Sequence, residues 1–316
     1  MRRRLRAAHF GVALHSKVKN ALDEARILVL GAQVLLGFQY RAFFEKGYEK
    51  LGPAERALEL GALLALLFTL GALFLPPARH RIVERGRDTA RFHRFTMTVM
   101  RVVLLPFAVG LSFDVAIAGN RIAGPWAGAA SGAIAFVAAL ALWYGHLFRT
   151  DRQEEEEPED AVEDTPLEHR IVEVLTETRI LLPGVQALLG FQLVMVLMET
   201  FPQLPRGVQL VHLVSLGFVA LATIVLMSSP AYHRIVEGGR DTERFHAFAS
   251  RMLLLALALL GPGFAGDLYV VLRRAKYDGA ALPVSLLTLL TFYSAWFGAM
   301  LILRRRRSGT LRSRSA

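Results

Sequence analysis

The sequence predicts an all-α polytopic membrane protein with eight transmembrane helices, arranged as two parallel four-helix repeats. Three observations support this prediction. Apolar residues make up 53% of the 316 residues, and they gather into blocks long enough to cross a bilayer. Lys and Arg are distributed unevenly between the ends of these blocks. Finally, the chain matches itself at one constant offset of 153 residues.

Each apolar block is continuous, which favours helices over the short alternating segments of a membrane β-barrel. A helix rises about 1.5 Å per residue, so about 20 residues cross about 30 Å of hydrocarbon. Residues 5–25 are expected to form an interfacial helix ahead of the first block, and residues 165–168 to begin the helix that leads into the fifth. The expected spans are residues 27–44, 57–77, 95–119, 125–148, 180–198, 207–229, 252–272 and 282–303.

The charge distribution predicts how these spans are oriented. In the eight-span topology, 27 Lys and Arg residues fall on the side that carries both termini and 9 on the other side. Positively charged loops remain in the cytoplasm, so both termini are predicted to be cytoplasmic. The formal charge of +10 is explained by topology and by anionic lipid headgroups. Nucleic-acid binding is not expected, because the arginines flank apolar blocks. The chain has no cysteine, which excludes disulfide and thiolate chemistry.

The internal repeat divides the chain. The segment 80–95, HRIVERGRDTARFHRF, matches 233–248, HRIVEGGRDTERFHAF, at 13 of 16 positions. Each copy holds four spans, and an even number of spans makes both copies enter and leave on the same face. The predicted units are a first repeat with a basic N-terminus (1–148), an acidic cytoplasmic linker (149–166), a second repeat (167–304) and a basic cytoplasmic tail (305–316).

Two motifs of the second copy suggest a family. Glu177-Thr178-Arg179 followed by LLPGVQALLGFQ, and then Ala231-Tyr232-His233-Arg234, resemble the uncharacterised prokaryotic membrane family catalogued as domain of unknown function 6328. That family is usually a single four-helix unit, so this chain resembles two fused tandem copies. The resemblance implies a multi-pass protein of the prokaryotic cytoplasmic (inner) membrane and carries over no activity.

The loop motif HRIVExGRDTxRFHxF is the strongest candidate site. Gly86 and Gly239 are expected to end one helix, and the Asp-Thr pairs that follow them to cap the next. Arg and His at a membrane interface bind phosphate headgroups. The alternative is a metal or haem held by histidines, although neighbouring arginines disfavour a cation, and no cofactor is predicted. HRIVE occurs a third time at 169–173. The candidate loop residues are His80, Arg87, Asp88, His93, His233, Arg240, Asp241 and His246.

Polar residues inside the spans form a second candidate set. The glutamines of the first helix of each copy either bond neighbouring helices or line a pathway through the membrane. Glu59 corresponds to His212, so the copies differ where a proton-linked group could lie. Asp114 with Arg121, and Asp267 with Arg274, are expected to form interfacial ion pairs. The set comprises Gln33, Gln39, Gln186, Gln192, Arg101, Glu59 and His212.

The sequence is compatible with three functions. A channel-like or transport protein with a path near the first helix of each repeat, surrounding a pore as a homodimer, requires the four glutamines to converge. A structural or interaction protein would bind anionic lipid or a partner complex through its basic loops. A haem or metal protein would use the loop histidines. We expect no enzyme, because the sequence has no Ser-His-Asp set, phosphate loop or HExxH motif.

Overall fold

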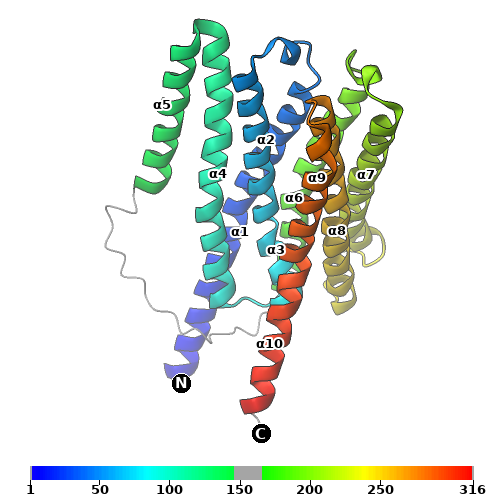
Figure 1. Ribbon diagram of the computed structural model, residues 1–316. Coiled ribbons are helices and arrows are strands. Elements are labelled where there is room, and N and C mark those ends of the chain that lie inside the picture. Colours follow the sequence, from blue (N-terminus) through cyan, green and yellow to red (C-terminus); the bar gives the residue numbers. More distant parts are fainter. Residues whose placement is uncertain (1, 146–165, 315–316) are drawn as a thin grey trace.

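The computed structural model describes residues 2–145 and 166–314, and the regular structure within these ranges is helical (Figure 1). The predicted linker lies outside the described residues except for Pro166. The first copy contains α1 (Arg2–Ala42), η1 (Tyr48–Lys50), α2 (Pro53–Leu73), α3 (Leu75–Arg79), η2 (His80–Glu84), α4 (Ala90–Ala123) and α5 (Pro125–Tyr144). The second contains α6 (Leu167–Val196), η4 (Phe201–Gln203), α7 (Arg206–Ile235), α8 (Glu243–Arg274), α9 (Asp278–Tyr293), η5 (Ser294–Gly298) and α10 (Ala299–Arg314).

Seven segments of the described chain are long and apolar enough to cross a membrane. They correspond to seven of the eight predicted spans, and many large apolar side chains on them face outward, among them Ile134 at 69% exposure. The remaining predicted span, residues 27–44, is the second half of α1. It is continuous with the expected interfacial segment in one helix of 41 residues, and it packs along α6 inside the bundle.

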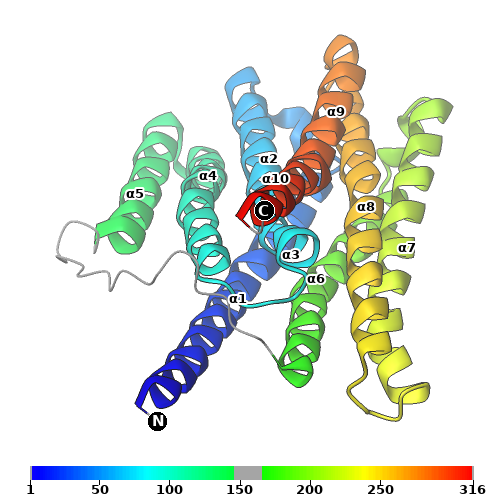
Figure 2. The same ribbon diagram turned by 90° about the horizontal axis from the view of Figure 1, so that it is seen from below.

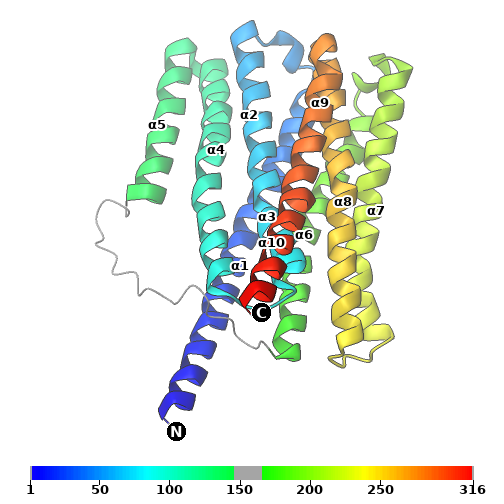
Figure 3. The same cartoon turned by 60° about the horizontal axis from the view of Figure 1, so that its bottom comes forward.

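The two copies lie side by side, with α1 to α5 on one side and α6 to α10 on the other (Figure 3). Seen along the bundle, α1 and α6 are in contact at the junction between the copies (Figure 2). The beginning of α1 and the end of α10 lie at the same end of the bundle (Figure 1). We call this end the terminal face and the other end the opposite face.

The contact between α1 and α6 is close because glycines lie where the helices meet. A Cβ atom added to Gly184 would lie 1.3 Å from Oε1 of Gln33, and one added to Gly37 would lie 2.0 Å from the ring of Phe191. Small residues let membrane helices approach each other in this way. The centre of the junction is therefore filled by side chains.

The copies differ at the end of their second helix. In the first copy, consecutive prolines at 76 and 77 end α2 at Leu73, and the chain continues through the short α3 and the π-helical turn η2. In the second copy Ser229 replaces the first of these prolines, and α7 continues unbroken to Ile235. Proline removes a backbone donor and clashes with the preceding turn, which explains why only the doubled proline breaks the helix.

The fourth helices also pack differently. Phe292 covers Gly71 of α2, and the indole Nε1 of Trp296 donates to the Gly71 carbonyl oxygen at 2.7 Å. The residues that correspond to Phe292 and Gly71 in the other copy are Ala139 and Ile224. A phenyl ring fits against a glycine. In the other copy Ala139 provides no large side chain, and Ile224 leaves no room for one. As a result the end of α9 and the following η5 and α10 reach the first copy, although α9 packs mainly on α8, while α5 packs on α4 at the edge of the bundle (Figure 3).

Candidate functional site

The two HRIVExGRDTxRFHxF loops share a closing hydrogen bond, although His80–Glu84 is a π-helical turn and the corresponding segment belongs to α7 as far as Ile235. The amide of Gly86 donates to the His80 carbonyl at 3.0 Å, and that of Gly239 donates to the His233 carbonyl at 2.9 Å. Both glycines have a positive φ. Gly86 directly follows the residue that caps η2, as expected, whereas α7 ends at Ile235, before Gly239. The predicted capping is confirmed for the threonines: the Thr89 and Thr242 hydroxyls accept from Phe92 N and Phe245 N.

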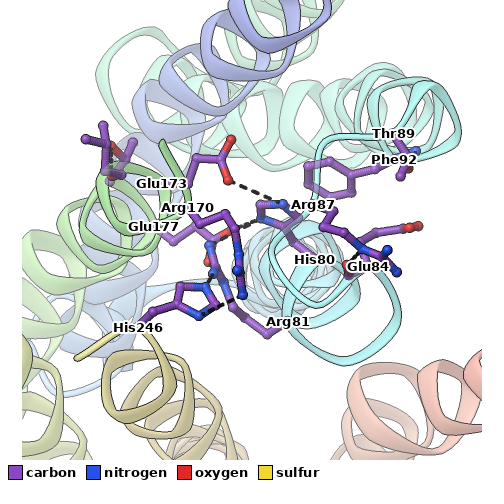
Figure 4. A network of polar contacts seen from close by, with 12 residues as sticks. His80, Arg81, Glu84, Arg87, Thr89, Phe92, Arg170, Glu173, Glu177 and His246 are labelled. Carbon is purple, nitrogen blue, oxygen red and sulfur yellow. Dashed lines mark hydrogen bonds and ion pairs between the residues drawn. The ribbon is translucent and has the colours of Figure 1, made fainter. Parts of the chain in front are cut away.

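His80 is fully buried and joins the copies. Its Nδ1 atom lies 2.5 Å from Oε1 of Glu177, which belongs to α6 of the other copy (Figure 4). Its ring stacks on Phe92, with the ring centroids 4.4 Å apart. The hydrogen bond and the stack together fix the position of the imidazole.

Arg81 extends the same contact to a third element. Its Nε atom donates to Oε2 of Glu177 at 2.5 Å, and its Nη1 atom lies 3.3 Å from Nε2 of His246 on α8. Arg170 approaches the other ring nitrogen of His246 at 3.2 Å (Figure 4). It also pairs with Glu243 at 3.0 Å. The loop of the first copy therefore contacts two helices of the second copy through charged groups.

Glu84, at the end of the η2 turn, binds the C-terminal helix. Its buried carboxylate lies 2.6 Å from Nη1 of Arg307 on α10 and 3.4 Å from Nε of Arg79. Removing one partner of a buried ion pair costs about 3 to 5 kcal/mol, because the remaining charge is left in a poorly solvating environment. The contact thus holds the basic tail segment against the first copy.

The third HRIVE segment also belongs to this cluster. Arg170, Glu173 and Glu177 occupy positions i, i+3 and i+7 of α6, a spacing that places them on one helix face. This face contacts His80 and His246. The repeated pentapeptide, which lies outside the 153-residue register, therefore supplies residues to the same cluster as the loop.

The corresponding loop of the second copy is more exposed to solvent. His233 lies 3.6 Å from Asp241, and Arg234, the counterpart of the buried Arg81, is exposed. Beside it, α6 and α7 form a groove of about 170 Å³. The groove is lined by Leu175, Thr178, Arg179, Leu182, Pro230, His233 and Arg234.

The expectation that four glutamines converge on one path is wrong. Gln33 is buried against Gly184 in the junction between the copies, while Gln186, its counterpart, is exposed. Gln39 and Gln192 each bond within their own copy. The reason is that α1 and α6 meet through glycines, a close approach that leaves no space between them for facing amides.

Instead of converging on a path, Gln39 and Gln192 each bind an aspartate inside the bundle. Gln39 donates to Asp114, and Glu59 lies close enough to interact with the same carboxylate. In the second copy the Gln192 amide donates to Asp267 at 2.5 Å, and Ser215 donates to it at 2.7 Å. His212, which corresponds to Glu59, lies 3.1 Å from the Gln192 carbonyl and 3.9 Å from Asp267. Each copy therefore holds one helix-bridging Gln–Asp pair.

The predicted Asp–Arg ion pairs are wrong. The aspartates bond the glutamines instead, Arg121 is exposed, and Arg274 pairs with Glu49 at 2.8 Å. Within a low-dielectric bundle an aspartate is stabilised by donors from neighbouring helices, whereas the long Arg side chains reach the surface. Arg101 is also exposed and lies outside both sites.

The histidines do not form a common ligand set. Within the described residues, the potential ligand atoms that converge belong to one histidine and two acids, His80, Asp88 and Glu173. His246 is held between two guanidinium groups, and His233 lies in the second loop. Arg87 and Arg240 are exposed beside their loops.

A pocket of about 240 Å³ lies on the opposite face, between the copies. Tyr48 and Arg56 of the first copy line it together with Arg274 of the second. Burial raises the pKa of Tyr48 to about 12, and the guanidinium groups of Arg56 and Arg274 lie 5.5 and 6.0 Å from its ring centroid. Glu49 also lines the pocket and pairs with Arg274, so its net positive charge comes from Arg56 and Lys276.

Comparison with known proteins identifies the family. The chain matches the family of unknown function DUF6328 twice, over residues 14–146 and 161–300. It belongs to this family. No curated protein and no solved structure matches it significantly. The two matches confirm the predicted pair of tandem copies. The chain therefore contains two members of one family, and their loops differ from each other as described above.

Four members of the cluster were not identified from the sequence: Arg81, Arg170, Glu173 and Glu177. Arg81 and Glu177 have identical residues at the corresponding positions of the other copy, Arg234 and Glu24, so neither repetition nor residue type separates the buried residue from the exposed one. The third HRIVE segment was a usable signal, because it repeats the loop sequence on the helix that the loop contacts.

Proposed function

We propose that this protein is a membrane scaffold that binds anionic phospholipid at its terminal face, with the headgroup held in the groove between α6 and α7. The observation that supports this most is the composition of that groove. Its basic side chains are Arg179, Arg234 and His233, and among the described residues that line it none is acidic. Leu175, Leu182 and Pro230 provide its apolar surface.

The charges of the groove are available to a ligand. Arg179 and Arg234 are both exposed, whereas the residue that corresponds to Arg234 in the other copy is neutralised by Glu177. The acid that corresponds to Glu177 is Glu24, and it is exposed rather than packed against the second loop. An anion supplied from outside the chain would compensate these arginines.

The position of the groove favours a lipid over a free anion. It lies at the end of α7 and against the middle of α6, two helices that are long and apolar enough to span a membrane, beside the exposed side chain of Ile235. A phospholipid can place its phosphate against the arginines and its chains along the leucines. Each Arg near an anionic membrane surface contributes about 1 kcal/mol, so two of them together change affinity about thirtyfold.

The test measures thermal unfolding of the full chain in detergent with added phosphatidylglycerol, phosphatidylcholine or inorganic phosphate. We expect phosphatidylglycerol to raise the midpoint more than phosphatidylcholine, with the increment falling as salt rises. The R179Q/R234Q variant should lose most of this increment. The matched control, R121Q/R206Q, removes two exposed arginines outside the groove and should keep it. Equal increments in both variants would contradict the proposal, and an equal effect of phosphate would assign the groove to a free anion.

A transport role rests on a separate observation, the pair of Gln–Asp sites inside the bundle. Acidic groups within membrane-spanning helices characterise proton and ion pathways, and here one occurs in each copy at corresponding positions. Proteoliposomes that contain a pH-sensitive dye, driven by a potassium gradient with valinomycin, test this role directly. We expect a proton flux that D114N/D267N abolishes and Q186A leaves unchanged, since Gln186 lies outside both sites. Absence of flux in the wild-type protein would exclude proton conduction.

A further inference from the structure

We propose that His80, Asp88 and Glu173 bind a divalent transition-metal ion at the terminal face, in a site present in only one of the two copies. All three residues are buried. Their potential ligand atoms, one from each residue, lie within 4.8 Å of one another. The site is independent of the lipid groove.

His80 provides the observation that points to a ligand. Its Nδ1 atom is bound by Glu177, so the remaining ring nitrogen, Nε2, is the one directed at the site. This Nε2 atom is fully buried and has no hydrogen-bond partner among the described residues; its nearest acid, Glu173, is 3.7 Å away. A metal-binding histidine commonly has this arrangement, with one ring nitrogen held by a carboxylate and the other free to bind the ion.

The spacing fits a metal better than a direct contact. Ligands at about 2.1 Å from a tetrahedral ion lie about 3.4 Å from one another, whereas a hydrogen bond to a carboxylate would be about 2.8 Å long. The distance of 3.7 Å between Nε2 and the Glu173 oxygen is close to the former value. The three ligand atoms lie within 4.8 Å of one another, so binding requires the carboxylates to move closer together.

The donor set selects the kind of ion. One imidazole nitrogen with two carboxylate oxygens suits Zn²⁺, Mn²⁺, Fe²⁺ or Co²⁺, while Ca²⁺ and Mg²⁺ prefer oxygen ligands alone. Arg81, which follows His80 in the chain, is paired with Glu177 at 2.5 Å. Arg170 is paired with Glu243 at 3.0 Å. Both arginines therefore have acids of their own.

The second copy provides a natural control. The residues that correspond to His80, Asp88 and Glu173 are His233, Asp241 and Asn20. Asn20 replaces a carboxylate, and both Asn20 and Asp241 are exposed. The second loop thus repeats two of the three ligands in a position where water competes for them.

The experiment uses the full chain in detergent, treated with EDTA and then titrated with Zn²⁺ or Co²⁺. Calorimetry measures the number and affinity of bound ions, and the visible absorption of Co²⁺ reports its coordination. We expect one tight site per chain and a Co²⁺ spectrum that changes in E173Q and is lost in H80N. Affinity should fall at least tenfold in each of E173Q and D88N. The control variant H233N should bind like the wild type.

Three results would overturn the proposal: no binding at millimolar ion, equal binding by the wild type and E173Q, or loss of binding in H233N. The E173Q variant replaces a carboxylate by an amide of the same shape, so it keeps the test valid if H80N does not fold. Lipid stabilisation measured on the same E173Q protein should be unchanged, because Glu173 does not line the groove.

Discussion

The Nδ1 atom of His80 lies 2.5 Å from Oε1 of Glu177, and this contact connects the loop of one copy to the first helix of the other. Both residues are fully buried, and Arg81 binds the second oxygen of the same carboxylate. Their counterparts, His233 and Glu24, make no such contact in the described structure; Glu24 is exposed. The same motif therefore has two roles. In the first copy the contact of His80 and Arg81 with Glu177, which we call the joint, holds the two copies together, and in the second copy the loop forms an exposed basic surface.

The joint predicts a large difference between two corresponding substitutions. E177Q leaves Arg81 and His80 without their buried carboxylate and should lower the free energy of unfolding by about 3 to 5 kcal/mol. E24Q changes an exposed residue and should alter it by less than about 0.5 kcal/mol. Thermal unfolding in detergent compares the two. A similar effect of both variants would show that the joint is not a major contact between the copies.

The glycine junction predicts opposite signs for two alanine substitutions. G184A places a methyl group against the Gln33 side chain, including its Cβ atom at 2.7 Å, and should destabilise by about 1 to 3 kcal/mol. G31A, at the corresponding position of α1, meets nothing within 4 Å and should stabilise by about 0.5 to 1 kcal/mol through improved helix propensity. Both are measured by denaturant unfolding. If G184A proved neutral, α1 and α6 would be further apart than described.

The tryptophans of the fourth helices test the asymmetric packing. W296F removes the donor to the Gly71 carbonyl and should cost about 1 to 3 kcal/mol. Trp143, its counterpart, is half-buried at the edge of the bundle, so W143F should cost clearly less. Fluorescence of the two single variants adds a second readout, since the buried Trp296 should be the less accessible to a water-soluble quencher. Equal quenching would contradict this packing.

The two Gln–Asp sites should contribute unequally to stability. Asp267 is buried and accepts from both Ser215 and Gln192, whereas Asp114 is half-buried and accepts from Gln39. D267A should therefore destabilise more than D114A, by about 1 to 2 kcal/mol, because it leaves more buried donors without an acceptor. Thermal unfolding of the two variants measures the difference. The reverse order would indicate that Glu59 strengthens the first site more than Ser215 strengthens the second.

The sequence predicts the helices well because apolar blocks and an ungapped repeat are properties of the chain itself. It also predicts the loop backbone, since Gly86 and Thr89 act through local geometry. Partner choice is different: Glu177 and Glu24 both have a Leu two residues before them and an Arg two residues after them, yet the packing of the copies buries only Glu177. The unequal packing of the two copies follows from single residue differences, such as Gly71 in the first copy and Ile224 at the corresponding position of the second. The effect of each difference depends on which helix packs against that position. Repetition alone predicts symmetry, so it could not predict a joint that forms once.

Labelling of single cysteines tests most directly whether the two copies face the same way. The chain has no cysteine, so R85C, G238C and R121C each carry one reactive group at an exposed position. A membrane-impermeant maleimide applied to intact cells and to inverted vesicles reports the side of each residue. We expect residues 85 and 238 to be labelled together in inverted vesicles and residue 121 to be labelled in intact cells. Labelling of residues 85 and 238 from different sides would contradict this expectation.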